Sequence, residues 1–169
     1  MNTQQKGRQA PEPEEPWSEI IAGLWMGGHR WVDPGGLRPA VVADEFDLVV
    51  SLFVRPGHGP DEGVEHLVLA IPDDPLAAHQ IGRVAELART VAGAVRERRT
   101  TLVRCQYGYN RSGLVVGQAL MELGHDAPAA IELIRRRRSP WALHNRVFED
   151  YLRTGLEIAR LLTDLDPLS

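Results

Sequence analysis

The sequence predicts an α/β domain with a mostly parallel central sheet flanked by helices. Short apolar runs alternate along the chain with longer segments in which apolar residues recur every three or four positions. Hydrophobic residues make up 43% of the 169 residues, which is enough for one core of ordinary domain size. Strands that alternate with helices are typical of a layered fold whose connections cross over a sheet.

Four short apolar runs are predicted as strands. Each is too short for a typical helix and is rich in β-branched residues or leucine. A glycine-rich turn at residues 27–28 follows the first run, Pro72 ends the third, and the fourth leads directly into Cys105. The predicted strands are Ile20–Met26, Leu48–Phe53, His66–Ile71 and Thr101–Arg104.

Helical patterns account for most of the remaining sequence. Apolar residues at helical spacing predict a helix from Ala78 to about Arg98. The segment Ser112–Leu123 is apolar almost throughout, which predicts a helix buried on most sides, and Gly124 is typical of a helix end. Asp126 can cap the next helix, which we expect to run to about Arg138. A last amphipathic helix is predicted over Arg146–Asp164.

The N-terminal residues differ in composition from the rest of the chain. Residues 1–16 are rich in Gln, Glu and Pro, so we expect a disordered tail followed by a single domain over 17–169. The segment lacks the apolar core of a signal peptide, and no run approaches the roughly 18 apolar residues of a membrane span. We therefore expect a cytoplasmic, monomeric protein with no membrane contact.

Charge and cysteine content exclude several classes of function. The net charge of −4 provides no global positive field, which makes nucleic acid an unfavourable partner. Cys105 is the only cysteine, so neither an intramolecular disulfide nor a multi-cysteine metal site can form. The six histidines show no close helical pair of the kind that binds metal, and we interpret them as surface or core residues. We expect no metal and no cofactor.

The segment from Cys105 to Ser112 carries the chemistry. A predicted strand ends at the cysteine, five loop residues follow, and Arg111 stands where a helix begins. Such a loop points several backbone N–H groups at one place, and the helix dipole adds positive potential there. Arg111 offers a planar pair of donors to phosphate oxygens, and the same potential favours a thiolate at Cys105. The pattern predicts a phosphate site that contains its own nucleophile.

This segment resembles the active-site loop of the protein tyrosine phosphatase superfamily, in which C-x5-R is followed by Ser or Thr. The opening segments IIAGLWMGG and DLVVSLF and the acidic loop upstream resemble the dual-specificity branch in particular. The resemblance covers about residues 17–162. It implies a dual-specificity phosphatase-like fold and hydrolysis of phosphate monoesters through a cysteinyl-phosphate, without metal.

The resemblance also implies roles for single residues. Cys105 would be the nucleophile, Arg111 would bind phosphate, and Ser112 would stabilise the departing thiolate. The loop Ile71-Pro72-Asp73-Asp74-Pro75 resembles the family's W-P-D loop and makes Asp73 the general acid, with Asp74 as the alternative. The implied phosphate-binding residues are Gln106, Tyr107, Gly108, Tyr109, Asn110 and Arg111, with the two tyrosines at the mouth of the pocket.

Three features lie outside the family pattern or leave alternatives open. Arg104 stands where the family usually has a histidine that orders the loop. Consecutive helix positions cannot share one face, so the arginines at 135–138 are predicted mainly as a solvated face, with an acidic or phosphorylated partner as the alternative. The segment at 139–148 is predicted to pack beside the loop in a structural role.

The predicted substrate is phosphotyrosine in proteins, with phosphoserine and phosphothreonine as further substrates. The loop between Cys105 and Arg111 contains no lysine, which disfavours a highly charged head group. Two alternatives remain at this point. One is a phosphatase acting on a nucleotide, an RNA 5′-phosphate or a phosphoinositide, and the other is a catalytically silent phosphate-binding module.

Overall fold

A computed structural model describes residues 10–165 and contains a five-stranded central sheet. The strand order is β1-β2-β7-β5-β6, in which β1 is antiparallel to β2 and every other pair is parallel. The strands are β1 (Trp17–Ile21), β2 (Leu24–Gly27), β5 (Leu48–Ser51), β6 (Glu65–Val68) and β7 (Thr101–Arg104). The predicted α/β class with a mostly parallel sheet is confirmed.

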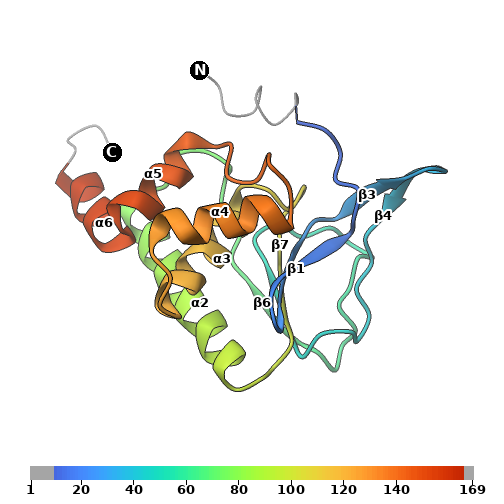
Figure 1. The fold of residues 1–169 in the computed structure, drawn as a ribbon. Helices are drawn as coiled ribbons and strands as arrows, with labels where there is room; N and C mark the ends of the chain where they lie inside the picture. Colours follow the sequence, from blue (N-terminus) through green and yellow to red (C-terminus); the bar gives the residue numbers. More distant parts are fainter. Residues whose placement is uncertain (1–9, 166–169) are drawn as a thin grey trace.

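Among the described residues, five helices lie together on one side of this sheet (Figure 1). They are α2 (Ala78–Arg96), α3 (Arg111–Glu122), α4 (Ala127–Arg137), α5 (Arg146–Thr154) and α6 (Leu156–Leu165). None of the helices within residues 10–165 combines the length and the apolar character needed to cross a membrane.

Alternating residues of the strands face two hydrophobic clusters. Leu48 and Val50 of β5 point into the main core beneath the helices, whereas Val49 belongs to a smaller cluster on the opposite face. This alternation is the period of two that a strand imposes on its side chains. Both faces of β5 are therefore buried, which explains why its sequence is a continuous apolar run.

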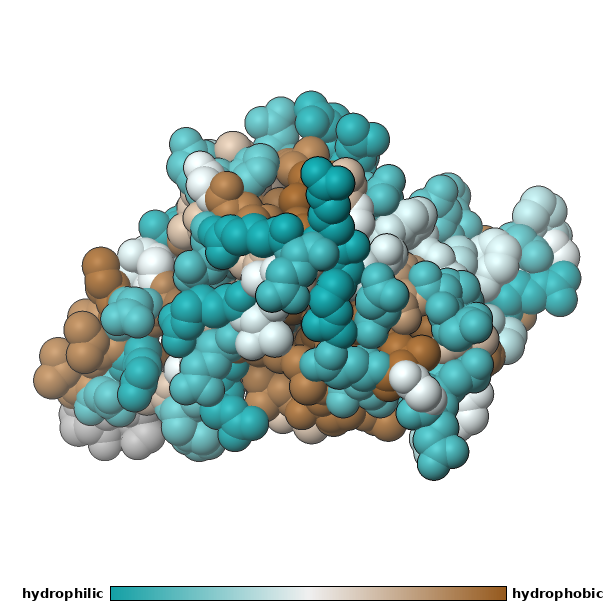
Figure 2. Space-filling view, turned by 90° about the horizontal axis from the view of Figure 1, so that it is seen from below, coloured by the Kyte–Doolittle hydropathy of each residue, from teal (hydrophilic) through white to brown (hydrophobic). Residues whose placement is uncertain are grey.

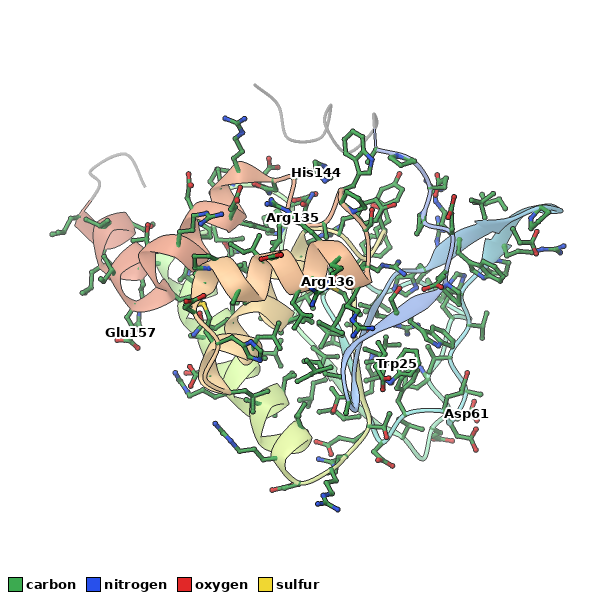
Figure 3. All side chains as sticks on the ribbon, in the orientation of Figure 1. Trp25, Asp61, Arg135, Arg136, His144 and Glu157 are labelled. Atoms are coloured by element: carbon green, nitrogen blue, oxygen red, sulfur yellow. The ribbon has the colours of Figure 1, made fainter. Side chains whose placement is uncertain are left out.

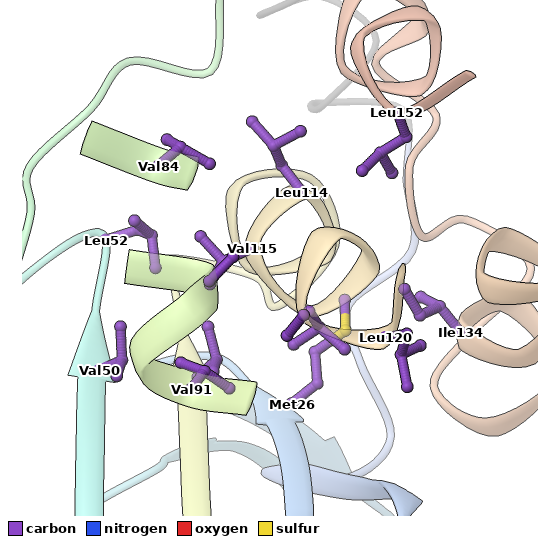
Figure 4. Close-up of a cluster of buried hydrophobic side chains, with 14 of the residues drawn as sticks. Met26, Val50, Leu52, Val84, Val91, Leu114, Val115, Leu120, Ile134 and Leu152 are labelled. Atoms are coloured by element: carbon purple, nitrogen blue, oxygen red, sulfur yellow. The ribbon is translucent and has the colours of Figure 1, made fainter. Parts of the chain in front are cut away.

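Helix α3 lies at the centre of the main core, as its apolar sequence predicts. Figure 4 shows Leu114, Val115 and Leu120 of this helix surrounded by side chains from the sheet and from the other helices. All three are fully buried. The helix that starts at Arg111 is thus fixed on all sides, which holds its N-terminus in one position.

The carboxyl ends of three parallel strands meet at one edge of the sheet. Arg104, the last residue of β7, is in register with Gly27 of β2 and with Ser51 of β5. Cys105 follows immediately and donates its backbone N–H to the Gly27 carbonyl at 3.2 Å. In parallel sheets this edge is where ligand sites form.

Two segments predicted as single elements are divided in the structure. The predicted strand Ile20–Met26 is wrong, because the chain turns at residues 22–23 between β1 and β2. The predicted helix Arg146–Asp164 is also wrong, because Gly155 has φ 97° and separates α5 from α6. Glycine reaches this φ region at little cost, so a single residue redirects the chain.

Two further elements were not predicted. Strands β3 (Arg30–Asp33) and β4 (Gly36–Pro39) form a separate antiparallel ribbon that extends away from the helices (Figure 1). The ribbon has few buried side chains, which is why its sequence lacks an apolar alternation.

The prediction of a disordered tail over 1–16 is corrected for its second half, since residues 1–9 lie outside the described part of the chain. Residues 10–16, here called the N-terminal strap, lie against the domain. Val32 donates its N–H to the Pro13 carbonyl at 2.8 Å, and Gly28 donates to the Pro16 carbonyl at 3.2 Å. Arg30 forms an ion pair with Glu12 at 2.8 Å. The strap is held mainly through backbone carbonyls, which leave no pattern in the sequence.

Helix α6 leaves much of its apolar surface uncovered. Figure 2 shows hydrophobic residues gathered at the left of the view, the side on which α6 lies in Figure 1. Leu156 and Ala159 are buried against the domain. The exposed apolar residues of this helix are Ile158, Leu161, Leu162 and Leu165.

Candidate active site

A pocket of about 370 Å³ opens where β7 meets α3, and we call it the loop pocket. It brings together the loop that follows β7, the loop that follows β6 and the turn before α5. The lining residues are Pro72, Asp73, Asp74, Cys105, Gln106, Tyr107, Tyr109, Asn110, Arg111 and His144. Nine of these ten residues come from the two loops singled out by the sequence, and His144 is the exception.

Cys105 lies at the bottom of the loop pocket with only 2% of its surface exposed. Its Sγ is 3.3 Å from the hydroxyl of Ser112, which is fully buried in the first turn of α3. The hydroxyl can therefore donate a hydrogen bond to a thiolate, and the N-terminus of α3 adds positive potential. The position suits a sulfur atom that alternates between nucleophile and leaving group.

Arg111 begins α3 and presents an unpartnered donor. Its Nη1 donates weakly to the Ile71 carbonyl at 3.4 Å, and its guanidinium lies 5.4 Å from the ring centre of Phe53. Its buried Nε has no hydrogen-bond partner among residues 10–165. A buried donor without an acceptor costs about 1–3 kcal/mol, so this side chain is suited to an anion that enters the pocket.

Two side-chain amides hold the carboxyl of Asp73. Its Oδ2 accepts a hydrogen bond from the side-chain amide of Asn110 at 2.9 Å, and its Oδ1 accepts one from Asn145 at 2.7 Å. The side-chain oxygen Oδ1 of Asn110 in turn accepts a hydrogen bond from the backbone N–H of Asn145 at 3.0 Å. Asp74 lines the same pocket. The amides fix the orientation of the Asp73 carboxyl relative to the loop that contains Cys105.

Asn145 was assigned only a structural role from the sequence, and its contact with Asp73 was missed. Its side-chain oxygen caps α5 by accepting from Val147 and Phe148, which is the role that its position predicts. The amide nitrogen makes the second contact, with Asp73. That contact joins residues 72 positions apart, and no local signal in the sequence indicates it.

Arg104 does not line the loop pocket. Arg104 ends β7, and its side chain is fully buried away from the pocket. It donates to the hydroxyl of Ser51 at 3.1 Å and to the carbonyls of His58 and Gly59 at 3.0 and 2.6 Å. Burial lowers the pKa of Arg104 to about 10. Arg104 thus joins the end of β7 to the loop at 58–59.

His29 and His58 form a pair next to Arg104. Their Nδ1 atoms are 3.2 Å apart, and Nε2 of His29 donates to the Phe53 carbonyl at 2.9 Å. Burial lowers the pKa of His29 to about 4, the bond to Phe53 opposes the shift, and the positive charge of Arg104 adds to it. The interpretation of His29 as a core residue fits its 1% exposure, whereas His144 at the pocket was missed.

Arg138 braces the loop from behind. Its guanidinium donates to the carbonyls of Tyr107 and Gly108 at 3.0 and 3.2 Å, and to the Glu15 carbonyl in the strap at 2.9 Å. A Cβ added to Gly108 would lie 2.5 Å from the backbone carbonyl carbon of Gly27 and 2.6 Å from Nη2 of Arg138, and the residue has φ 76°, so only glycine fits at this position. Gly108 therefore forms the back of the loop and does not line the pocket.

The arginine run at 135–138 divides into two pairs. Arg136 and Arg137 are exposed, as a solvated face predicts. Arg135 instead donates to the carbonyls of Ala142 and Leu143 at 3.0 Å each, and Arg138 holds the loop. Figure 3 shows how differently Arg135 and Arg136 are placed around α4. The two inward-facing arginines connect α4 to the segments that surround the pocket.

Tyr107 and Tyr109 stand side by side at the pocket, with stacked rings 6.3 Å apart. The Tyr107 hydroxyl accepts a hydrogen bond from Arg30 at 2.8 Å, and the Tyr109 hydroxyl donates to the Pro11 carbonyl at 2.8 Å. The strap and the β3 ribbon therefore fix both aromatic rings from outside the loop.

No protein-family model matches the sequence, and no curated protein matches it either. Solved structures do match the fold. Human DUSP28 superposes with a TM-score of 0.68 at 21% identity, covering 89% of this chain and 99% of that one. A mouse putative dual specificity phosphatase complexed with zinc tungstate gives 0.61 at 24% identity, with 89% and 93% covered. A human tyrosine phosphatase-like serine/threonine/tyrosine-interacting protein gives 0.59 at 20% identity, with 85% and 97% covered. The chain therefore has the fold of the dual-specificity phosphatases.

Proposed function

We propose that this protein is a cysteine-dependent phosphatase that hydrolyses phosphate monoesters. The observation that carries the proposal is the unpartnered Nε of Arg111 in the same pocket as Cys105. A phosphate at this position would accept from Arg111 and from the backbone N–H groups at the start of α3. The cysteine sulfur would then lie beneath the phosphorus.

The first step transfers the phosphoryl group to the enzyme. The thiolate of Cys105 attacks phosphorus, a sulfur–phosphorus bond forms, and the bond from phosphorus to the ester oxygen breaks. Asp73 gives its proton to the departing oxygen, which leaves as an alcohol or phenol. Arg111 and the loop amides stabilise charge on the remaining phosphate oxygens.

The second step regenerates the cysteine. A water molecule attacks phosphorus, Asp73 takes the proton from that water, and the sulfur–phosphorus bond breaks to release inorganic phosphate. The hydroxyl of Ser112, 3.3 Å from Sγ, donates to the departing thiolate. The amides of Asn110 and Asn145 orient the carboxyl of Asp73, which supports its assignment as the acid.

The proposed substrate class is phosphotyrosine in proteins, with phosphoserine and phosphothreonine as further substrates. The aromatic walls at Tyr107 and Tyr109 suit an aryl phosphate. Proteins with this fold carry names such as dual specificity phosphatase, and one from Orf virus is described as a tyrosine phosphatase with triple substrate specificity.

Hydrolysis of p-nitrophenyl phosphate in the presence of a chelator tests this function. We expect the wild type to release phosphate and Cys105→Ser to be slower by on the order of 10⁴-fold or more. The serine variant should still bind inorganic phosphate, because Arg111 and the loop remain. A wild type that binds phosphate without hydrolysing any aryl phosphate would favour the silent binding module instead.

A further inference from the structure

A second groove of about 390 Å³ lies beside the loop pocket. The N-terminal strap forms one wall, and the end of α4 with the turn that follows it forms the other. The lining residues are Pro11, Glu12, Pro13, Glu14, Glu15, Tyr109, Arg137, Arg138, Ser139, Pro140 and Trp141. Tyr109 lines both this groove and the loop pocket, so the two hollows adjoin.

An aromatic strip leads from the loop pocket into the second groove. The ring of Tyr109 makes an edge contact with His144 at 6.3 Å, and His144 makes another with Trp141 at 6.0 Å. Trp141 is 40% exposed, although tryptophan is usually well buried. Exposed tryptophan next to a pocket is typical of a contact that another chain completes.

The strap wall of the groove carries negative charge. Glu12 is paired with Arg30, and Glu15 accepts a hydrogen bond from Ser18 at 2.9 Å. Glu14 is exposed and forms no ion pair with any residue in the range 10–165. Exposed Arg137 lies in the opposite wall, so one wall of the groove is negatively charged and the other is positively charged.

We propose that the second groove binds the polypeptide that flanks the phosphorylated residue, with an apolar side chain against Trp141 and a basic side chain beside Glu14. The inference rests on the proposed phosphatase function and specifies its substrate as a protein. A small phosphomonoester fits in the loop pocket alone and would not contact the second groove. A chain that continues from the phosphorylated residue must pass over the pocket rim, and Tyr109 leads it toward Trp141.

The first test compares Trp141→Ala with the wild type on two substrates. One substrate is p-nitrophenyl phosphate, and the other is a phosphotyrosine peptide with leucine and arginine flanks. Trp141 lines the second groove but not the loop pocket. We therefore expect kcat/KM for the peptide to fall about tenfold and that for the small substrate to stay within twofold. An equal loss on both substrates would overturn the inference, since Trp141 would then act through His144 on the loop pocket.

The second test reverses the charge of the strap wall. The wild type should prefer a peptide with arginine flanks over one with glutamate flanks, and Glu14→Arg should invert this order. Asp61→Arg is the matched control, because it makes the same change of charge far from His144 (Figure 3). A preference that Glu14→Arg leaves unchanged, or that Asp61→Arg alters equally, would overturn the groove as the binding site.

These outcomes are separable from failure of the proposed function. If the wild type hydrolyses no aryl phosphate, the phosphatase proposal itself fails. If it hydrolyses p-nitrophenyl phosphate while both variants treat every peptide as the wild type does, only the groove inference fails. Thermal unfolding of each variant is the control for folding, and we expect the exposed substitutions to leave the unfolding temperature unchanged.

Discussion

Single residues around Asp73 link the candidate acid to the candidate nucleophile. Asn110 belongs to the loop that begins at Cys105, and Asn145 begins α5, yet both donate to the same carboxyl group. The Asp73 carboxyl is therefore oriented by two segments that also shape the loop pocket. Its position depends on contacts that are distant in sequence, and each can be removed by one substitution.

Replacing Asn145 by serine tests this orientation. Serine retains an oxygen that can cap α5, but it lacks the amide that donates to Asp73 at 2.7 Å. We expect kcat to fall about tenfold on phenyl phosphate, whose leaving group needs a proton, and much less on p-nitrophenyl phosphate. If Asp74→Asn reproduces this leaving-group dependence while Asn145→Ser does not, the acid is Asp74.

His29 predicts a pH dependence of stability. Its pKa is about 4 in the folded protein against 6.5 for the unperturbed group, so the unfolded chain binds more protons between these values. The stabilisation is full above about pH 6.5 and is lost as the pH falls toward 4. Its size is at most roughly 3 kcal/mol for a shift of this extent. Urea unfolding at pH 5 and pH 7.5 should show a smaller difference for His29→Gln than for the wild type. If the stability difference between the two pH values is the same in His29→Gln as in the wild type, the lowered pKa of His29 is contradicted.

At the scale of elements, the loop between Cys105 and Arg111 is supported by several segments that contact it from different sides. Helix α3 fixes its end, β2 pairs with its first residue, and the strap fixes its tyrosines. Arg138, at the end of α4, donates to the carbonyls of Tyr107 and Gly108 in this loop. These contacts hold the loop between Cys105 and Arg111 in one conformation.

Arg138→Gln should loosen the loop without altering the pocket lining. We expect kcat/KM for p-nitrophenyl phosphate to fall by about 10-fold to 100-fold, with weaker inhibition by inorganic phosphate, because small misplacements of reacting groups are costly. Arg136→Gln is the control, since Arg136 is exposed on the same helix. Equal behaviour of the two variants, or a loss explained by unfolding alone, would contradict the bracing role of Arg138.

At the scale of the whole molecule, the sequence predicted what depends on local chemistry. Strand β7 matches its predicted bounds, α3 begins one residue earlier than predicted, and Asp126 caps α4 by accepting from Ala129 at 2.9 Å. Each of these elements carries its own signal, either an apolar period or a capping residue. Cys105, Arg111 and Ser112 lie in this locally determined part, whereas the orientation of Asp73 depends on contacts distant in sequence.

The contacts that could not be predicted join distant segments through backbone groups. Arg138 lies 30 and 31 residues from the carbonyls it supports, and the strap is held by carbonyls of prolines. Any residue has a carbonyl, so such contacts leave no trace in composition or periodicity. The side-chain contact between Asn145 and Asp73 was missed for a different reason, because it joins residues 72 positions apart without a local signal in the sequence.

The most direct test of the account is to find the phosphoryl group on the enzyme during turnover. Asp73→Asn should accumulate a cysteinyl-phosphate with p-nitrophenyl phosphate, because this leaving group needs little protonation whereas the second step still needs a base. After rapid quenching and digestion, mass spectrometry should locate the phosphate on the peptide that contains Cys105. Turnover without any phosphate on that peptide, or with phosphate on another residue, would contradict Cys105 as the nucleophile.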